Sequence, residues 1–511
     1  MTDWTSGYVS DIGYTFGYYT ELNPLRSKLA LLKSGIEYPE FTTACELGFG
    51  QGISTNIHAA ASECSWFGTD FNPAQAGFAQ ELAKVSGSGA SLYDEAFEDF
   101  CNRPDLPDFD YIGLHGIWSW ISEKNREVIV DFARRRLKVG GVLYVSYNTM
   151  PGWAAFAPMR KLMTQHAEII GSEGKGIVDR IDGSLAFSEE LLKTNPIFLQ
   201  ANPQIADRIA KLKDENRHYL AHEYFNLDWH PMHFSEMLSS LESAKVGYAC
   251  SADYLDQLDS INFTQDQLIL LNSIPDMMLR QSIRDFMMNT QFRKDYWIKG
   301  VRRQPYFDQL EAIKDESVIL CNLREEVPLK IVCGLGEANL AENIYSPILD
   351  FLSDNKEHSI GDILEAVQNK DIQLVQVVEA LILLGHSSKI NSVQKQQTPK
   401  MLESCGRLNN YLMGLSRSKG DQDHLASPVT GGGIQVSRLE QLYLLGLQSG
   451  IETTADLASY TWNLLNTQGQ KVLKEGKALE TPEQNIAEIE SQISVFKGKR
   501  LEILRNLKIA Q

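Results

Sequence analysis

The stretch ACELGFGQG at residues 44–52 places one acidic residue ahead of three glycines that are spaced two apart. A turn of this kind between a strand and a helix presents backbone N–H groups to a ligand, and glycine is needed because a Cβ would block close approach. The glycines are Gly48, Gly50 and Gly52. A dinucleotide fingerprint is G-x-G-x-x-G with its acidic residue about 20 positions later. Because Glu46 precedes the glycines, the spacing disfavours NAD, and a P-loop is excluded because no Gly-Lys-Ser/Thr follows.

The chain around this turn alternates short β-type runs with helical stretches from position 42 to position 148. The β-type runs are TTACELGFG, CSWFGTDF, SLYDE, FDYIGLHG and GGVLYVSYN, and stretches such as PAQAGFAQELAKV and SEKNREVIVDFARRRLK separate them. Strands that alternate with helices predict a parallel sheet covered on both faces. The later run HFSEMLSSLESAKVGYACSADYL has the helix, turn and strand typical of a late unit of the same fold. We therefore predict an α/β protein with a doubly wound, Rossmann-like sheet.

The rest of the chain divides by pattern into further segments. Residues 155–225 have helical character and no strand, and an insertion there would overhang the carboxyl edge of the sheet, where doubly wound folds bind ligands. We predict a helical lid for this insertion, and a helix over 274–300. The predicted organisation is an N-terminal segment at 1–30 for dimerisation or cofactor cover, a sheet domain at 31–256 that includes the lid, a helical regulatory segment at 257–345, a winged-helix-like module at 346–400 and a C-terminal helical domain at 401–511.

Composition and charge limit the classes of function. The formal net charge of −18 gives no support to binding of nucleic acid phosphates and suits a basic partner. No run approaches the roughly 20 apolar residues of a membrane span, and the first residues lack the n-region and h-region of a signal peptide. We expect a cytoplasmic protein without stable membrane insertion. The seven cysteines form no C-x-x-C pair, which argues against a structural zinc site or a disulfide framework.

Four motifs at successive strand ends resemble those of the class I S-adenosylmethionine-dependent methyltransferases. In that family an acidic residue precedes the glycines, and a second one ends strand two and binds the ribose hydroxyls. The second acidic residue here is Asp70, and a carboxylate suits this role because charge-assisted hydrogen bonds are strong. Either Glu95 or Asp94 falls where the family contacts the adenine amino group. The resemblance assigns S-adenosyl-L-methionine to Glu46, Gly48, Gly50, Gly52, Asp70, Phe71, Glu95, Ala96, Phe97 and His115.

A narrower resemblance covers about residues 8–300. The stretches GYYTELNPLR, HGIWSW, SYNTMPGW, HEYFNLDWHPMHFSEM and RDFMMNTQFRKD together resemble bacterial methyltransferases with a methyltransferase regulatory domain, among them the rickettsial protein-lysine methyltransferases. Those relatives methylate lysine side chains of an outer-membrane protein and are dimeric. The resemblance implies a homodimer that N-methylates accessible lysines of a protein, for example an outer-membrane or surface protein.

The acceptor side needs groups that align and desolvate a nucleophile, because methyl transfer is an in-line displacement in which the cofactor supplies the chemistry. A lysine amine must first lose its proton, which an aromatic-lined pocket promotes. Tyr147 and Asn148 end strand five and Trp118 follows strand four, at the edge that faces the ligand crevice. We predict that these three position the acceptor. Two roles remain open for His222, Glu223 and His233. One of them acts as a general base or binds the acceptor, or these side chains make structural hydrogen bonds.

Three rival functions differ in how well they fit the residues. A glycan or small-molecule acceptor remains the alternative, because the same lid and aromatic cluster would suit a sugar or a metabolite. A DNA amino-methyltransferase is disfavoured, because the Asn/Asp-Pro-Pro-aromatic motif that would hold a flipped base is absent after strand four. A non-catalytic binding module is disfavoured because every cofactor position is intact.

Overall fold

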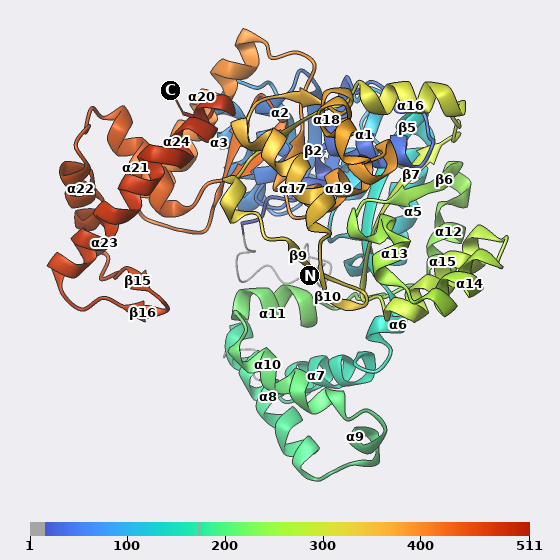
Figure 1. The fold of residues 1–511 in the computed structure, drawn as a ribbon. Helices are drawn as coiled ribbons and strands as arrows, with labels where there is room; N and C mark the ends of the chain where they lie inside the picture. The colour runs from blue at the N-terminus through green and yellow to red at the C-terminus, as the bar shows by residue number, and fades with distance from the viewer. Residues whose placement is uncertain (1–15, 172–173, 175, 511) are drawn as a thin grey trace.

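The structure, a computed structural model, describes residues 16–171, 174 and 176–510 of the 511-residue chain (Figure 1). Residues 1–15, half of the predicted N-terminal segment, lie outside the described residues. At the centre is a seven-stranded sheet in the order β3-β2-β1-β4-β5-β7-β6, parallel except that β7 is antiparallel to both of its neighbours. The strands are β1 Thr43–Leu47, β2 Ser65–Thr69, β3 Ser91–Tyr93, β4 Phe109–Leu114, β5 Leu137–Asn148, β6 Val246–Ser251 and β7 Phe292–Lys299.

Helices cover both faces of the sheet because alternate side chains of its central strands are apolar on both sides. On β5, Tyr144 packs into a core shared with helix α1 and residues 318–390, while Leu143 and Val145 pack into a core shared with α5 and α12. This double burial confirms the predicted α/β class with a Rossmann-like sheet. The covering helices are α1 Pro24–Lys33, α2 Ile53–Ala61, α3 Pro73–Ser86, α4 Phe97–Cys101, α5 Glu123–Arg136 and α12 Phe234–Leu241.

The helix predicted over 274–300 is only half present. Helix α15 spans Met277–Met288 and ends at Asn289, whose φ of 48° is left-handed; the chain then turns back as β7. In β7, Tyr296 and Trp297 point to opposite faces and both are fully buried. The prediction of helix was wrong for 292–299, because the charged run RKD at its start hides the two-residue alternation of a buried strand. Ion pairs of Arg293 with Asp285 and Asp295 neutralise that charge in the fold.

The insertion between β5 and β6 is helical and has its own apolar core (Figure 1). In the picture it hangs from the sheet domain as a separate body, joined to it at α6, and of its longer helices α11 lies nearest the sheet domain. We call this body the lid. Its helices, with the short α6 that leads into them, are α6 Met150–Trp153, α7 Ala157–Ile169, α8 Gly176–Lys193, α9 Ile197–Ala201, α10 Gln204–Asp214 and α11 Arg217–Tyr224.

Beyond β6 the chain is mostly helical with short sheets. Strand β8 (Ser317–Leu320) is the middle of a three-stranded sheet with β11 (His358–Ser359) and β12 (Ile390–Ser392). This middle strand precedes the predicted winged-helix-like range 346–400, and the winged-helix assignment stays a prediction. The other elements here are α13 Asp259–Asn262, α14 Gln265–Asn272, α16 Tyr306–Lys314, β9 Lys330–Cys333, β10 Gly336–Asn339, α17 Glu342–Phe351, α18 Ile360–Val367 and α19 Leu374–His386.

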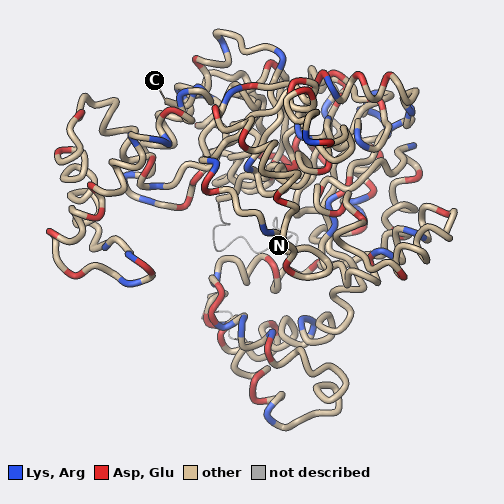
Figure 2. Tube along the Cα trace, viewed as in Figure 1, with Lys and Arg blue, Asp and Glu red and all other residues tan. Residues whose placement is uncertain are grey.

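The C-terminal part, from residue 399, packs its own apolar cluster against α2 and α3 of the sheet domain. Acidic and basic side chains are interspersed along the chain (Figure 2). Within the described ranges, no helix combines the length and the apolar character that a membrane crossing requires. The C-terminal elements are α20 Pro399–Leu415, β13 His424–Ser427, β14 Gly432–Gln435, α21 Arg438–Gln448, α22 Thr454–Thr467, β15 Leu473–Lys474, β16 Lys477–Ala478, α23 Pro482–Val495, a π-helical turn Phe496–Arg500 and α24 Leu501–Asn506.

Candidate functional site: a divided cavity at the carboxyl edge of the sheet

The glycine turn after β1 is left-handed at all three glycines, with φ of 73° at Gly48, 58° at Gly50 and 68° at Gly52. Side chains strain this conformation, so the backbone requires glycine. A Cβ on Gly48 would lie 2.5 Å from Ile117, whereas one on Gly50 would meet nothing closer than 3.9 Å. Gly48 must therefore be glycine both because of its left-handed φ and because Ile117 leaves no room for a side chain. Gly50 must be glycine because of its φ, and its lack of a side chain leaves open space beside the turn.

Gly52 has a different role from the other two. It precedes α2, and a Cβ there would lie 2.5 Å from the Cβ of Ala79 on α3. It does not belong to the lining of either cavity described below. The glycine is thus needed for close packing of two helices, and its contact with the cofactor stays a prediction.

Two carboxylates flank the turn. Asp70 accepts hydrogen bonds from the backbone N–H groups of Gly50, at 2.8 Å, and Asn72, at 3.0 Å, and so fixes the turn. Glu46 accepts a hydrogen bond from the hydroxyl of Thr55. Burial raises the pKa of Glu46 to about 8, against the opposing effect of Thr55, and burial raises the pKa of Asp70 to about 6. A ligand that donates hydrogen bonds or carries a positive charge would stabilise the ionised form of both carboxylates.

Two adjoining cavities open at this edge of the sheet. One is about 380 Å³ and the other about 270 Å³. Their separate linings indicate different parts of one ligand site. The residues common to both are Gly48, Asp70, Gln75, Gly116, Ile117 and Trp120.

The smaller cavity, which we call the ring cavity, brings together the residues assigned to adenine. Phe71, Ala96 and Phe97 line it with apolar surface, and Glu95 lies beside them. One carboxylate oxygen of Glu95 pairs with Arg103 at 2.6 Å, and its other oxygen has no hydrogen-bond partner in the described part of the chain. A flat apolar slot with a carboxylate at its edge suits an aromatic base that carries an amino group. Asp94, the other candidate, is exposed and is not part of this lining.

The larger cavity, which we call the transfer cavity, contains His115. The ring of His115 stacks on Tyr19 with centroids 3.9 Å apart, and its Nδ1 lies 2.7 Å from the hydroxyl of Tyr144. Burial lowers the pKa of His115 to about 4, so the imidazole is neutral at physiological pH. The remaining lining includes Glu46 and the aromatic rings of Tyr19, Trp120, Tyr219 and Phe292.

The lid contributes one wall of the transfer cavity. His222 and Glu223 of α11 line it, as do Tyr219 and Asn226. His233, the third candidate for a base, instead begins α12 and stacks on Phe286. The lid therefore reaches the cavity through α11 and the residue shortly after it.

The three residues predicted to position the acceptor are buried behind the cavity wall. The hydroxyl of Tyr147 donates to Asp295 at 2.9 Å, and the indole N–H of Trp118 donates to the sulfur of Met232. The backbone N–H of Asn148 donates to the hydroxyl of Ser119. Neither cavity includes these three among its described lining residues. Their role at the acceptor stays a prediction, and in this arrangement it would be exerted through the neighbours that they hold in place.

Sequence reasoning gave no role to several lining residues. Tyr19 lies in the quoted stretch GYYTELNPLR, which carried the resemblance without a function. Phe292 sits at the start of the strand that was predicted as helix, so no strand-end argument could find it. Their shared property is that they reach the cavity from segments distant in sequence from β1.

Comparison with known proteins begins with a family model. Residues 216–299 match a model described as a predicted methyltransferase regulatory domain. This range runs from α11 through β7. The matched region therefore includes two strands of the sheet and one wall of the transfer cavity.

Relatives in sequence and structure extend over more of the chain. An uncharacterized protein of Synechocystis, sll1526, is 36% identical over 517 residues, which cover 99% of this chain and all of the relative. An uncharacterized protein of Rickettsia prowazekii, RP789, is 26% identical over 69% of this chain and 62% of its own length. Among solved structures, PKMT2 from Rickettsia typhi in complex with AdoHcy has a TM-score of 0.69 at 16% identity, over 97% of this chain and 100% of that one. The fold extends over nearly the whole chain.

Proposed function

Because the chain belongs to the class I S-adenosylmethionine-dependent methyltransferases that carry a methyltransferase regulatory domain, we propose that it N-methylates lysine side chains of a protein. The observation that carries the proposal is the divided cavity. The ring cavity suits the adenosine part of S-adenosylmethionine, and the transfer cavity suits its methionine part together with an acceptor.

The residues present fit the cofactor. Asp70 ends β2 beside both cavities and would accept hydrogen bonds from the ribose hydroxyls. Glu46 lies in the transfer cavity with a raised pKa, and the ammonium group of the methionine part would favour its ionised form. Support for this fit also comes from PKMT2 of Rickettsia typhi, which holds AdoHcy in the same fold.

The acceptor side fits an amine that must arrive without its proton. When bound, the cofactor would supply a methyl group on a sulfonium sulfur. A neutral amine would attack the methyl carbon in line as its C–S bond breaks, S-adenosylhomocysteine would leave as a thioether, and the methylated ammonium would then release one proton. Aromatic walls from Trp120, Tyr219 and Phe292 lower the pKa of an amine between them. His115 is neutral and so adds no positive charge beside the acceptor amine.

The choice of lysine in a protein is supported by the sequence resemblance to the rickettsial protein-lysine methyltransferases and by the fold match along the whole of PKMT2. The net charge of −18 suits a basic acceptor segment. We propose in the same way that the protein acts as a homodimer in the cytoplasm on lysines of an outer-membrane or surface protein.

A labelling experiment tests the acceptor class. The protein is incubated with a cell lysate and S-adenosylmethionine labelled in its methyl group, and proteins, polysaccharides and metabolites are then separated. We expect label in protein, located on lysine by mass spectrometry and lost with His115→Ala. Label found only in polysaccharide or metabolites would refute the lysine assignment and leave the methyltransferase assignment in place.

A further inference from the structure

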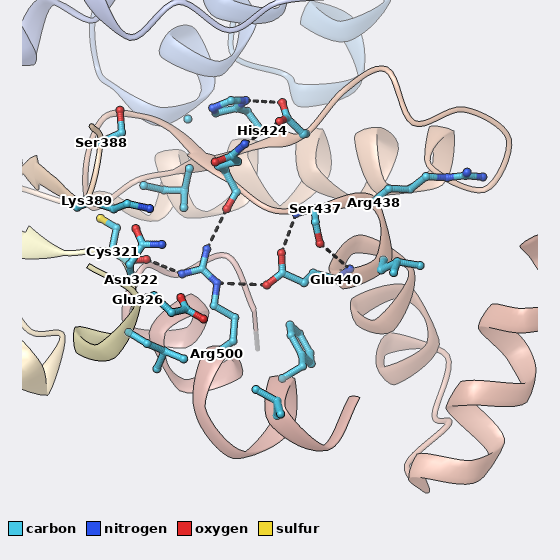
Figure 3. Close-up of a pocket in the computed structure, with 18 of the residues that line it drawn as sticks. Cys321, Asn322, Glu326, Ser388, Lys389, His424, Ser437, Arg438, Glu440 and Arg500 are labelled. Atoms are coloured by element: carbon cyan, nitrogen blue, oxygen red, sulfur yellow. Dashed lines mark hydrogen bonds and ion pairs between the residues drawn. The ribbon is translucent and has the colours of Figure 1, made fainter. Parts of the chain in front are cut away.

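A third cavity lies away from the divided cavity, between the C-terminal part and residues 321–391 (Figure 3). Its volume is about 1070 Å³. We call it the C-terminal cavity. Three separate parts of the chain line it: Tyr18, the end of α19 and the turn into β12 together with the segment 321–326 after β8, and the segment from β13 to the π-helical turn. Ligand sites are common where such parts meet.

One wall of this cavity is rich in hydrogen-bond donors. The four consecutive residues His386, Ser387, Ser388 and Lys389 form the turn after α19, and all of them line the cavity. They carry an imidazole whose Nδ1 pairs with Asp253, two hydroxyls and an ammonium group, and the hydroxyl of Ser387 already donates to the backbone carbonyl of Leu384. The ammonium of Lys389 has no carboxylate within ion-pair distance in the described ranges, and Figure 3 shows this side chain extending along the cavity wall. The ammonium of Lys389 and the hydroxyl of Ser388 are donors on one short stretch of chain, and such groups suit phosphate oxygens.

The opposite wall carries carboxylates that already have partners. Arg500 joins the two walls, because it donates to the backbone carbonyls of Cys321 and Gln435 and pairs with Glu440 (Figure 3). Among the lining residues, Glu326 alone is a carboxylate without an ion pair in the described structure. The pairs on the opposite wall are Asp423 with His424 at 2.8 Å, Glu488 with Lys474 at 2.7 Å and Glu440 with Arg500 at 3.3 Å.

We propose that the C-terminal cavity binds a phosphorylated small molecule of nucleotide size, and that this ligand alters cofactor binding at the divided cavity. The phosphate would contact the turn from His386 to Lys389. The hydroxyl or amino groups of the ligand would face Glu326 and the carboxylates of the opposite wall. The volume is large enough for a whole nucleotide, and the polar walls suit a hydrophilic ligand rather than an apolar one.

The first link to the divided cavity is the backbone of residues 17–19. Tyr18 lines the C-terminal cavity, where its ring stacks on His424 with centroids 4.7 Å apart. Gly17 and Tyr19, its two chain neighbours, line the transfer cavity. Because adjacent Cα atoms are about 3.8 Å apart, this short stretch is a wall shared by both cavities. A ligand that displaces the backbone at Tyr18 would also displace Tyr19, which stacks on His115.

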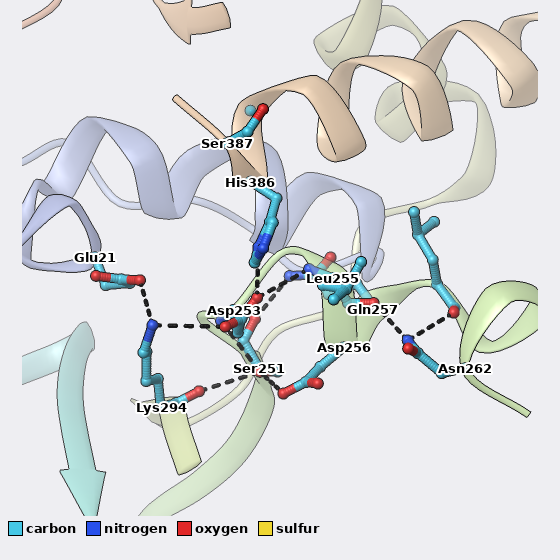
Figure 4. A network of polar contacts seen from close by, with 12 residues as sticks. Glu21, Ser251, Asp253, Leu255, Asp256, Gln257, Asn262, Lys294, His386 and Ser387 are labelled. Carbon is cyan, nitrogen blue, oxygen red and sulfur yellow. Dashed lines mark hydrogen bonds and ion pairs between the residues drawn. The ribbon is translucent and has the colours of Figure 1, made fainter. Parts of the chain in front are cut away.

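The second link is a chain of ion pairs that ends in the same segment (Figure 4). Nδ1 of His386 lies 2.9 Å from one oxygen of Asp253, and Nζ of Lys294 lies 3.5 Å from the other. The same Nζ is 2.7 Å from Glu21. His386 belongs to the wall that would hold the phosphate, and Glu21 follows the shared wall by two residues. Both links thus converge on residues 17–21.

Calorimetry with ADP and with inorganic pyrophosphate as probes tests the site. S-adenosylhomocysteine is kept at saturation so that the ring cavity is filled. We expect ADP to bind, and at least about tenfold more weakly to Lys389→Ala, because a charge-assisted contact is lost. Ser388→Gly removes a hydroxyl at a residue whose φ of 54° glycine adopts freely, so it should weaken binding without strain. Lys395→Ala, at an exposed lysine outside the lining, is the control and should bind as the unaltered protein does.

The results separate the possible sources of phosphate. Pyrophosphate binding as tight as ADP binding would support a free phosphate ligand, and tighter ADP binding would support a nucleotide. Absence of binding by both probes at millimolar concentration would overturn the site. ADP is also titrated without S-adenosylhomocysteine. Binding under that condition alone, unchanged by Lys389→Ala and Ser388→Gly but lost in Asp70→Ala, would likewise overturn the site, since the ADP would then occupy the ring cavity.

The effect on the cofactor rests on the proposed function and is measured separately. The affinity for S-adenosylhomocysteine is determined alone and with saturating ADP, and we expect a change of at least about fivefold, the lower range of allosteric coupling. In Lys294→Gln, which breaks the ion-pair chain, ADP should still bind while the change shrinks. An unchanged affinity in the unaltered protein would overturn the coupling. A protein that binds ADP but no S-adenosylhomocysteine at all would refute the proposed function and leave the C-terminal site standing.

Discussion

The ring cavity and the transfer cavity lie side by side but are assembled differently. The ring cavity is lined by residues 48–125 and Asp228, so nearly all of it comes from consecutive strand-to-helix turns. The transfer cavity adds Tyr19 from the N-terminal segment, α11 from the lid and Phe292 from β7. The ring cavity thus depends on local backbone geometry, whereas the transfer cavity depends on how distant segments pack together. Substitutions in the two should therefore fail in different ways.

The largest expected effect comes from the glycine turn. Gly52→Ala should lower the free energy of unfolding by about 3 kcal/mol. The loss has two causes: alanine is strained in the left-handed conformation of residue 52, and its Cβ would clash with Ala79. Chemical denaturation measures it. The control is Gly77→Ala on α3, where a Cβ meets nothing within 4 Å and where alanine should stabilise the helix by about 0.5–1 kcal/mol. Equal stability of the two variants would show that the turn tolerates a side chain.

The next effect concerns the ribose contact. Asp70→Ala should weaken cofactor binding by about 1.5–3 kcal/mol, the range for hydrogen bonds to a charged group. Asp94→Ala, at an exposed carboxylate after β3, should bind the cofactor normally. Calorimetry with S-adenosylhomocysteine compares them. Equal affinity in both variants would remove Asp70 from the ribose contact.

The pH dependence of binding follows from the raised pKa of Glu46, about 8, and that of Asp70, about 6. Cofactor binding favours the ionised carboxylates and so releases protons, and affinity should rise by up to about tenfold per pH unit between pH 6 and pH 8, about 1.4 kcal/mol per unit. The pH dependence of stability in the cofactor-free protein has the opposite sign, because stability falls as pH rises. A carboxyl whose pKa is higher in the fold than in the unfolded chain loses stability as pH rises from the unfolded value toward the folded one.

Calorimetry in buffers of different ionisation enthalpy measures the protons released on cofactor binding. An affinity that is flat between pH 6 and pH 8, with no proton release, would contradict the role given to Glu46. The Thr55→Val variant sharpens the test, because loss of its hydrogen bond should raise the pKa of Glu46 further and shift the profile to higher pH.

The smallest effect is expected on the acceptor side. Phe292→Ala should lower kcat/KM for the acceptor about fivefold, about 1 kcal/mol, because one aromatic wall of the transfer cavity is lost. Affinity for S-adenosylhomocysteine should stay within about 1 kcal/mol, since the residue lies outside the ring cavity. Phe286→Ala, an exposed phenylalanine on α15 outside both linings, is the control. A loss in cofactor affinity equal to the loss in kcat/KM would erase the distinction between the two cavities.

The sequence by itself determined the alternating strands and helices up to Asn148, the glycine turn and the carboxylate at the end of β2. These features could be predicted because each depends on short-range rules: the periodicity of buried side chains, the left-handed backbone that glycine permits, and the placement of polar groups at strand ends. The helical character of the lid was predictable for the same reason. Ala96 and Phe97 were located by their place after β3.

Only the tertiary structure decided which residues line the transfer cavity. Tyr147 lies at the end of a strand as predicted, yet its hydroxyl donates to Asp295 on β7. The sequence pattern had predicted a helix at that strand because its first residues are charged. Tyr19 and Phe292 are 273 positions apart and meet across one cavity because β7 inserts beside β5 and the N-terminal segment packs over the sheet edge. Such contacts depend on long-range docking of segments, which leaves no periodic pattern in the sequence. The physical reason is that local backbone preferences determine each element, whereas the burial of apolar surface shared between elements determines how they meet.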